Sequence, residues 1–269
     1  MPKITTSEVV DPRLLSSLMR KNLLEALYAV HCQIFDGVDI KEFAKDVVNS
    51  NAERTFIVLH KNSLGEIVGY CATHFFDQLL YNKPSSILRV EAGLLKEYRG
   101  QNSNITHIIR QVLRYRMSRP FRPFYYLEAL VHPSSYLLLS KYSDQIWPHY
   151  RHVIQKDMSS FLAQMNKSFG LTPVNRENPA IVHVGWQTRD TEQDRHFWTN
   201  SKNEVIRFYV EQNPGYERGH GLLTLVSITA GSTLRAVGIL LRDSAKRHCT
   251  RFLPRRAFRR LTKTNFDDL

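Results

Sequence analysis

The chain has 269 residues, which fits one enlarged domain or two small ones, and its 42% hydrophobic content is enough for a sizeable core. Three cysteines are too few for a disulfide framework or a cysteine metal cluster, so we expect a reducing, cytoplasmic setting. The opening residues, MPKITTSEVVDPR, lack the apolar core of a signal peptide. The formal net charge is +12, and residues 242–269 alone carry nine Lys and Arg against three Asp. This composition predicts a basic C-terminal tail.

Two helices and a hairpin are expected in the first 76 residues of the chain. Apolar residues at helical spacing predict an amphipathic helix over residues 13–31. A second helix over 36–50 should begin near Asp39, because Glu42 follows three residues later in a capping-box pattern. The segments TFIVLH and GEIVGYCATHFF then predict a β-hairpin over residues 55–76, joined by KNSLGE.

The stretch from residue 87 to residue 116 has the pattern of a strand, a turn and a helix. ILRVEAGLL (87–95) suits a buried strand, and an apolar stripe from Ile105 predicts the helix. The turn KEYRGQNSN is rich in Gly, Asn and Ser, which tolerate unusual backbone angles and leave amide groups free. Free N–H groups at the positive end of a helix dipole favour a phosphate, and Arg99 could add a charge-assisted contact. The alternative is an ordinary strand–helix connection that binds nothing.

The second half of the chain alternates between predicted strands and helices. The expected elements are a strand at 124–133, a helix at 132–154 with a break at Pro148, a helix at 158–171 ending at Gly170, a strand at 180–187, a helix at 195–213 and a strand from 221. Residues 221–241 are mostly apolar, but Arg235 within them would cost roughly 2.5–3.5 kcal/mol on membrane insertion. We therefore expect a buried strand in the first half of that segment rather than a membrane span.

The order of these elements resembles the GNAT N-acyltransferase superfamily over roughly residues 14–145. That family has the pattern Arg/Gln-x-x-Gly-x-Gly/Ala at a strand–turn–helix junction, preceded by a hairpin and followed by a further strand. Aligned on Arg99, the two glycine positions are Asn102 and Asn104. The resemblance implies a mixed α/β fold with a mostly antiparallel central sheet flanked by helices. We expect one such domain over 1–241, with an insertion around 145–205 in an enlarged C-terminal half.

The resemblance also implies a substrate and a place to bind it. The donor would be acyl-CoA or an acylated acyl carrier protein, and the acceptor would be the amine of a small molecule or a protein. Two groups of residues are expected at the donor. The pyrophosphate would be held by Arg99, Gly100, Gln101, Asn102, Ser103 and Asn104, and the pantetheine arm would pair with Leu94 and Leu95.

Acyl transfer needs a base for the amine and a proton for the leaving thiolate. The resemblance offers Glu91, Glu128 or His132 as the base, and burial among apolar neighbours would raise the pKa of a carboxyl group toward neutrality. Glu91 could instead pair with an arginine, and His132 could cap the following helix. The proton donors suggested by the resemblance are tyrosines that could equally be structural, namely Tyr136, Tyr142 and Tyr209.

A histidine pair and the basic tail are the other features of the sequence that could bind a partner. His149 and His152 have helical metal-ligand spacing but no third ligand, so no metal is expected. Residues 242–269 could lie on an anionic membrane surface or dock an acidic carrier protein, or remain a disordered solubilising tail; nucleic acid is the less favoured partner. The alternative to an enzyme is a non-catalytic module on the same fold, which uses this tail to bind a membrane or nucleic acid.

Overall fold

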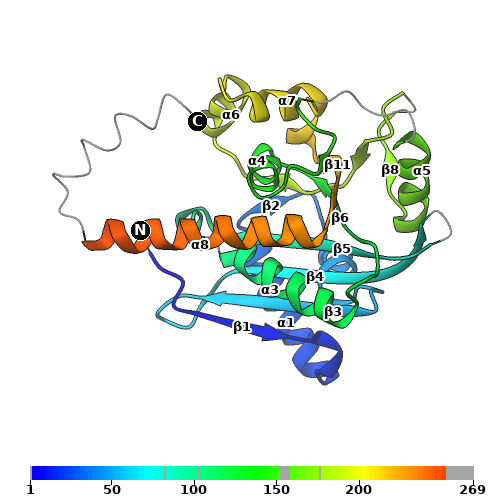
Figure 1. Ribbon diagram of the computed structural model, residues 1–269. Helices are drawn as coiled ribbons and strands as arrows, with labels where there is room; N and C mark the ends of the chain where they lie inside the picture. Colours follow the sequence, from blue (N-terminus) through cyan, green and yellow to red (C-terminus); the bar gives the residue numbers. More distant parts are fainter. Residues whose placement is uncertain (1, 81–82, 102, 152–157, 176, 253–269) are drawn as a thin grey trace.

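The computed structural model describes residues 2–80, 83–101, 103–151, 158–175 and 177–252 (Figure 1). Within them, one nine-stranded sheet has the order β1-β3-β4-β5-β6-β11-β9-β8, with β7 also paired to β11. All described pairs are antiparallel except β5 with β6. The strands of this sheet are β1 (Thr6–Val10), β3 (Arg54–Lys61), β4 (Ile67–Leu80), β5 (Lys83–Leu94), β6 (Phe124–Leu130), β7 (Ile146–Trp147), β8 (Thr172–Pro173), β9 (Ile181–His183) and β11 (His220–Ser227). A separate two-stranded ribbon pairs β2 (Phe35–Asp36) with β10 (Gln187–Thr188). The expected mixed, mostly antiparallel sheet is confirmed.

Helices cover both faces of the sheet (Figure 1). They are α1 (Ser17–His31), α2 (Ile40–Phe43) with a π-helical turn at Ala44–Val48, α3 (Ser103–Ser118), α4 (Pro133–Tyr142), α5 (Met158–Phe169), α6 (Glu192–Thr199), α7 (Glu204–Gln212) and α8 (Ala230–Phe252), with short 3-10 turns at Pro12–Leu14, Lys96–Tyr98 and Tyr216–Arg218. α1 and α2 lie on one face, and α3, α4 and α8 lie on the other.

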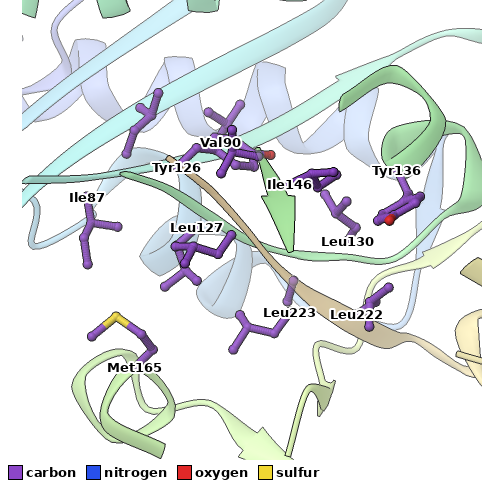
Figure 2. Close-up of a cluster of buried hydrophobic side chains, with 14 of the residues drawn as sticks. Ile87, Val90, Tyr126, Leu127, Leu130, Tyr136, Ile146, Met165, Leu222 and Leu223 are labelled. Carbon is purple, nitrogen blue, oxygen red and sulfur yellow. The ribbon is translucent and has the colours of Figure 1, made fainter. Parts of the chain in front are cut away.

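The sheet divides the core because successive side chains of a strand point to opposite faces. On β3, Ile57 and Leu59 join the cluster under α1, whereas Val58 joins the larger cluster on the other side. Figure 2 shows part of that larger cluster, where Leu127 of β6 and Met165 of α5 are both buried. Each fully buried side chain of this size contributes roughly 1.5–3 kcal/mol, so these two clusters hold the helices on the sheet.

The first half of the chain follows the expected elements closely. Ser16 caps α1 by accepting the Met19 N–H, so the helix begins at Ser17 instead of residue 13. The capping box at Asp39 and Glu42 is present. The hairpin, the central strand and the α3 helix also form as expected. Strand β1 was not expected; it pairs with β3 and forms an edge of the sheet.

The second half departs from the expected elements in several places. The helix predicted over 132–154 ends at Tyr142, because Ser143 is extended and the chain turns to pair β7 with β11. The helix predicted over 195–213 is two helices, and Asn203 caps the second of them. The strand predicted over 180–187 is the two short strands β9 and β10.

The apolar segment 221–241 divides between β11 and α8, so a strand does occupy its first half. None of the described helices is long and apolar enough to cross a membrane. The predicted start of the basic tail at residue 242 falls inside α8. Residues 253–269 lie outside the described part of the chain.

Candidate functional site

The parallel strands β5 and β6 separate partway along their length. The described parallel pairs are Ser86 with Phe124, Ile87 with Tyr125 and Leu88 with Tyr126, although both strands continue beyond them. The side chain of Glu128 bridges the opening. Its Oε2 accepts the backbone N–H of Val90 on β5, and its Oε1 accepts the backbone N–H of Ala129 on β6, both at 3.0 Å. A carboxylate therefore takes the place of a strand partner in this gap.

Arg89 links two buried carboxylates at the opening. Its guanidinium lies 2.9 Å from Glu128 Oε1 and 3.4 Å from Glu91 Oε1. On the other side of Glu91, His74 Nε2 lies 3.0 Å from Glu91 Oε2, and His74 Nδ1 shares a hydrogen bond with Thr55 Oγ1 at 2.9 Å. The His74–Glu91 contact is close but is not aligned as a hydrogen bond, so its contribution is chiefly electrostatic.

Burial and neighbouring charges set the ionisation of these groups. Burial opposes the charge of Arg89, but Glu128 and Glu91 outweigh it and raise the pKa of Arg89. Burial likewise opposes the charge of Glu91, but His74 and Arg89 outweigh it and hold the pKa of Glu91 below its ordinary value. Burial raises the pKa of Glu128, with Arg89 acting against it. Glu91 is thus the carboxylate that stays ionised at the lower pH.

We include a third carboxyl group, Asp46, in what we call the carboxylate cluster (Asp46, Glu91 and Glu128, with Arg89 and His74), because the charges of Glu91, Arg89 and Glu128 act on its pKa. Asp46 lies on the π-helical turn after α2 and is partly exposed. Burial, and then the charge of Glu91, raise the pKa of Asp46 to about 6. Carboxyl groups poised near neutral pH suit general base catalysis. Sequence reasoning missed Asp46, although its position three residues after the buried Phe43 places it on the inner side of that helix.

The turn expected to hold a pyrophosphate lies at the start of α3. Gly100 has a φ of +80°, and Arg99 Nε donates to the Leu94 carbonyl at 3.1 Å. Ser103 Oγ is buried and has no hydrogen-bond partner among the described residues. An unsatisfied hydroxyl at the positive end of a sixteen-residue helix fits an anion. Asn102 lies outside the described residues.

Other groups of this turn are already engaged. Gln101 Nε2 donates to the Pro2 carbonyl at 3.0 Å, and Gln101 Oε1 accepts the Ile4 N–H at 3.2 Å. Asn104 Oδ1 lies 2.8 Å from His60 Nε2, whose pKa burial lowers. The segment before β1 therefore lies against the turn, and Gln101 would bind a phosphate only after releasing it.

Leu94 and Leu95 are half-buried at the end of β5, and their backbones pair with β4. Leu94 pairs with Gly69, and the Leu95 N–H donates to the Val68 carbonyl at 3.0 Å. Their predicted pairing with a pantetheine arm would therefore need backbone groups other than the Leu95 N–H.

The hydroxyl groups of the three candidate tyrosines each have a hydrogen-bond partner on another element of the fold. The Tyr136 hydroxyl donates to the Pro148 carbonyl at 2.6 Å, and the Tyr209 hydroxyl donates to the Leu130 carbonyl at 2.7 Å. Burial raises the pKa of both phenols. The Tyr142 hydroxyl lies 3.3 Å from Asp243 Oδ2 on α8. These contacts join separate elements of the fold, and burial keeps the Tyr136 and Tyr209 hydroxyls protonated.

His132 lies two residues beyond the end of β6, at the start of α4, and takes no part in the hydrogen bonds of the carboxylate cluster. It caps α4 by accepting the Ser134 N–H at 3.2 Å, which is the alternative to a catalytic base that the sequence suggested for His132. Its other ring nitrogen contacts Asp190 at 2.9 Å. Asp190 also lines a polar cavity of about 320 Å³ between the β2–β10 ribbon and the turn at Tyr216. The sequence offered no sign of the Asp190 contact, since 58 positions separate the two residues.

Helix α8 lies along α3 and α4 on the same face of the sheet (Figure 1). Its Ala236 and Leu240 pack on Ile105 and Ile109 of α3. An apolar cavity of about 90 Å³ remains between α3, α4, α8 and the sheet. Helix α8 therefore occupies most of the space between α3 and α4.

The described residues contain no group of three or more His, Cys, Asp or Glu side chains arranged to hold a metal ion. His149 stacks on Tyr150 with ring centroids 4.7 Å apart. His152, the other half of the predicted pair, lies outside the described residues.

No protein-family model and no curated protein sequence matches the chain. Several solved structures are similar to it at low identity. Arabidopsis thaliana NAA60 in complex with acetyl-CoA is 11% identical, covering 83% of this chain and 99% of that one with a TM-score of 0.36. The Escherichia coli GNAT family N-acetyltransferase YhbS in complex with CoA is 10% identical over 49% of this chain and 66% of its own, with a TM-score of 0.33. Mutant forms of the Vibrio cholerae spermidine/spermine N-acetyltransferase SpeG are 13% identical over 55% of this chain and 86% of their own, also with a TM-score of 0.33.

Proposed function

We propose that the protein is an acyltransferase that moves an acyl group from the thioester of acyl-CoA, or of an acyl carrier protein, to an amine. The observation that carries the proposal is the separation of β5 and β6, with the carboxylate cluster gathered at the opening. Separated strands leave backbone N–H groups that can polarise a carbonyl, and buried carboxylates attract and deprotonate an ammonium group.

The carboxylate cluster suits a cationic amine as the acceptor. It holds three carboxyl groups against the single permanent positive charge of Arg89. Asp46, whose pKa is raised to about 6, is our proposed base because it is partly exposed and ionised at neutral pH. It would take a proton from the ammonium group, after which the nitrogen attacks the thioester carbonyl. The C–S bond then breaks, an amide forms, and the second proton that the nitrogen loses passes to the thiolate.

The donor would bind from the turn at the start of α3. Arg99, Gly100 and Ser103 would hold its phosphate, because Ser103 is an unsatisfied donor at the helix N-terminus and Gly100 leaves the backbone open. Gln101 and Asn104 would join only on losing their present contacts with the Pro2 carbonyl and with His60. Both CoA and the phosphopantetheine of a carrier protein present such a phosphate.

Calorimetric titration of acyl-CoA thioesters and acylated carrier protein into the protein tests donor binding. Arg99→Glu should weaken binding at least tenfold by placing a negative charge at the phosphate. Arg110→Glu, the same charge change at an exposed position of α3, should change it less than twofold. Asp46→Asn should retain binding but lose most thiol release with an amine acceptor. No heat with any of these donors would overturn the proposal.

One observation favours the non-catalytic module as a second candidate. The Glu128 carboxylate already holds the N–H groups of Val90 and Ala129, which are the donors that a thioester carbonyl would need. A module of this kind would bind an acyl donor or an anionic surface without turnover. Donor binding with no thiol release for any amine, in both the natural protein and Glu128→Gln, would support this candidate over the enzyme.

A further inference from the structure

A continuous series of hydrogen bonds, outside the carboxylate cluster, links Ser134 to His132 and His132 to Asp190. Ser134 Oγ lies 2.6 Å from His132 Nδ1, and His132 Nε2 lies 2.9 Å from Asp190 Oδ2. The side chains of His132 and Asp190 are only 6% and 9% exposed, whereas Ser134 is exposed to solvent. The Ser134 hydroxyl, at the outer end of this series of hydrogen bonds, is therefore one that a substrate can reach.

The hydrogen bonds fix the tautomer of His132. The backbone N–H of Ser134 donates to Nδ1 at 3.2 Å, so Nδ1 carries a lone pair and the ring proton is on Nε2. That proton is donated to Asp190, a carboxylate. The lone pair of Nδ1 consequently faces the Ser134 hydroxyl, which is the arrangement in which an imidazole accepts the proton of a nucleophile.

The surroundings hold the imidazole in this orientation. The ring of Trp198 meets it edge-on with centroids 5.0 Å apart, and that of Tyr216 does so at 6.1 Å. Ser134 also lies in the first turn of the ten-residue α4, whose dipole stabilises a developing alkoxide. A helix cap needs only the Ser134 N–H and Nδ1. It explains neither the buried Asp190 on Nε2 nor the close approach of the Ser134 hydroxyl.

We propose that Ser134 is a nucleophile, activated by His132 and oriented through Asp190, that accepts an acyl group from a carboxylic ester or thioester. Ser134 Oγ attacks the acyl carbonyl while its proton passes to His132 Nδ1. The bond to the alcohol or thiol breaks, and the leaving group takes that proton. Water then attacks the acyl-serine, giving a carboxylic acid and restoring the Ser134 hydroxyl. This activity goes beyond the proposed amine acylation and needs neither the carboxylate cluster nor a phosphate site.

The test is covalent labelling of the full-length protein by a fluorophosphonate, followed by intact mass and peptide mapping. We expect one modification, on Ser134. Ser134→Ala should abolish it, and Ser135→Ala, which removes the neighbouring hydroxyl, should leave it unchanged. Asp190→Asn should slow the labelling at least 100-fold without lowering the melting temperature enough to unfold the protein. Hydrolysis of p-nitrophenyl acetate should fall in parallel in the same variants.

A second pair of variants keeps the test decisive if Asp190→Asn does not fold. In Ser134→Cys the thiol would face His132 Nδ1, so iodoacetamide should alkylate it at least tenfold faster at neutral pH than the thiol of Ser135→Cys. Absence of Ser134 labelling, equal labelling of Asp190→Asn and the natural protein, or equal alkylation of the two thiols would each overturn the proposal. Labelling is measured without CoA or amine, so its outcome is independent of the proposed acyl transfer to amines.

Discussion

Glu128 on β6 accepts the backbone N–H of Val90 on β5 at 3.0 Å, across the gap where the two strands cease to pair. A backbone group that loses its strand partner in the interior must find another acceptor, because an unsatisfied buried N–H costs roughly 1–3 kcal/mol. Glu128 supplies that acceptor, and Arg89 compensates its charge. The opening in the sheet therefore depends on one side chain for its stability.

Glu128→Gln tests this dependence. Glutamine keeps the size of the side chain but leaves Arg89 with one fewer carboxylate, and its NH₂ group would face backbone N–H groups. We expect the free energy of unfolding to fall by about 3 kcal/mol, as for other buried ion pairs that lose one partner. Urea unfolding followed by circular dichroism measures it. Glu8→Gln breaks the exposed Lys61–Glu8 pair and should cost less than about 1 kcal/mol. Equal losses in the two variants would contradict this account of Glu128.

Asp46→Asn tests the raised pKa of Asp46 through the pH dependence of stability. Because the folded pKa of about 6 exceeds the ordinary 3.8, the folded state binds more protons than the unfolded chain between these values. The contribution of Asp46 is therefore fully present below about pH 4 and is lost as the pH rises through 6. The free energy of unfolding of the natural protein, minus that of Asp46→Asn, should fall by roughly 2 kcal/mol between pH 4 and pH 7.

The difference between the two proteins is the informative quantity, since other groups titrate in the same range. Burial lowers the pKa of His31 and of His107 to about 4, so these residues make the protein more stable as the pH rises. Their contributions cancel in the comparison with Asp46→Asn. A difference that does not vary with pH would mean that Asp46 is not poised near neutrality, and would weaken its proposed role as the base.

The strands and helices that the sequence predicted well have local signals. Ile57, Val58 and Leu59 alternate between the two faces of the sheet, and Asp39 with Glu42 marks the start of α2. β1 was missed because its residues are mostly exposed and carry no alternation. The helix predicted past Tyr142 fails for a nonlocal reason, which is the pairing of Ile146 with Val226 of β11.

Part of the candidate site was also predictable, because some of its residues carry a local sequence signal. Glu91 and Glu128 stood out as charges within apolar strands, and both lie in the carboxylate cluster. Asp46 and Asp190 carry no such signal. They reach their partners only through folding, Asp46 from the turn after α2 and Asp190 from a loop 58 positions beyond His132. Local sequence patterns therefore identified the strand residues of the site but not the residues that loops bring to it.

Gly37→Ala tests the close approach of Gly37, which follows β2, to Gly185, which precedes β10. Gly37 has a φ of +93°, and a Cβ there would lie 2.2 Å from the Gly185 carbonyl oxygen. Both strain and overlap act against alanine, so we expect a loss of at least about 3 kcal/mol in the free energy of unfolding. Gly65 is the matched control, because its φ is +80° but a Cβ would meet nothing within 4 Å. Gly65→Ala should cost only about 1 kcal/mol in the same urea titration. Similar losses in both variants would show that backbone strain alone, and not the approach to Gly185, makes Gly37 necessary.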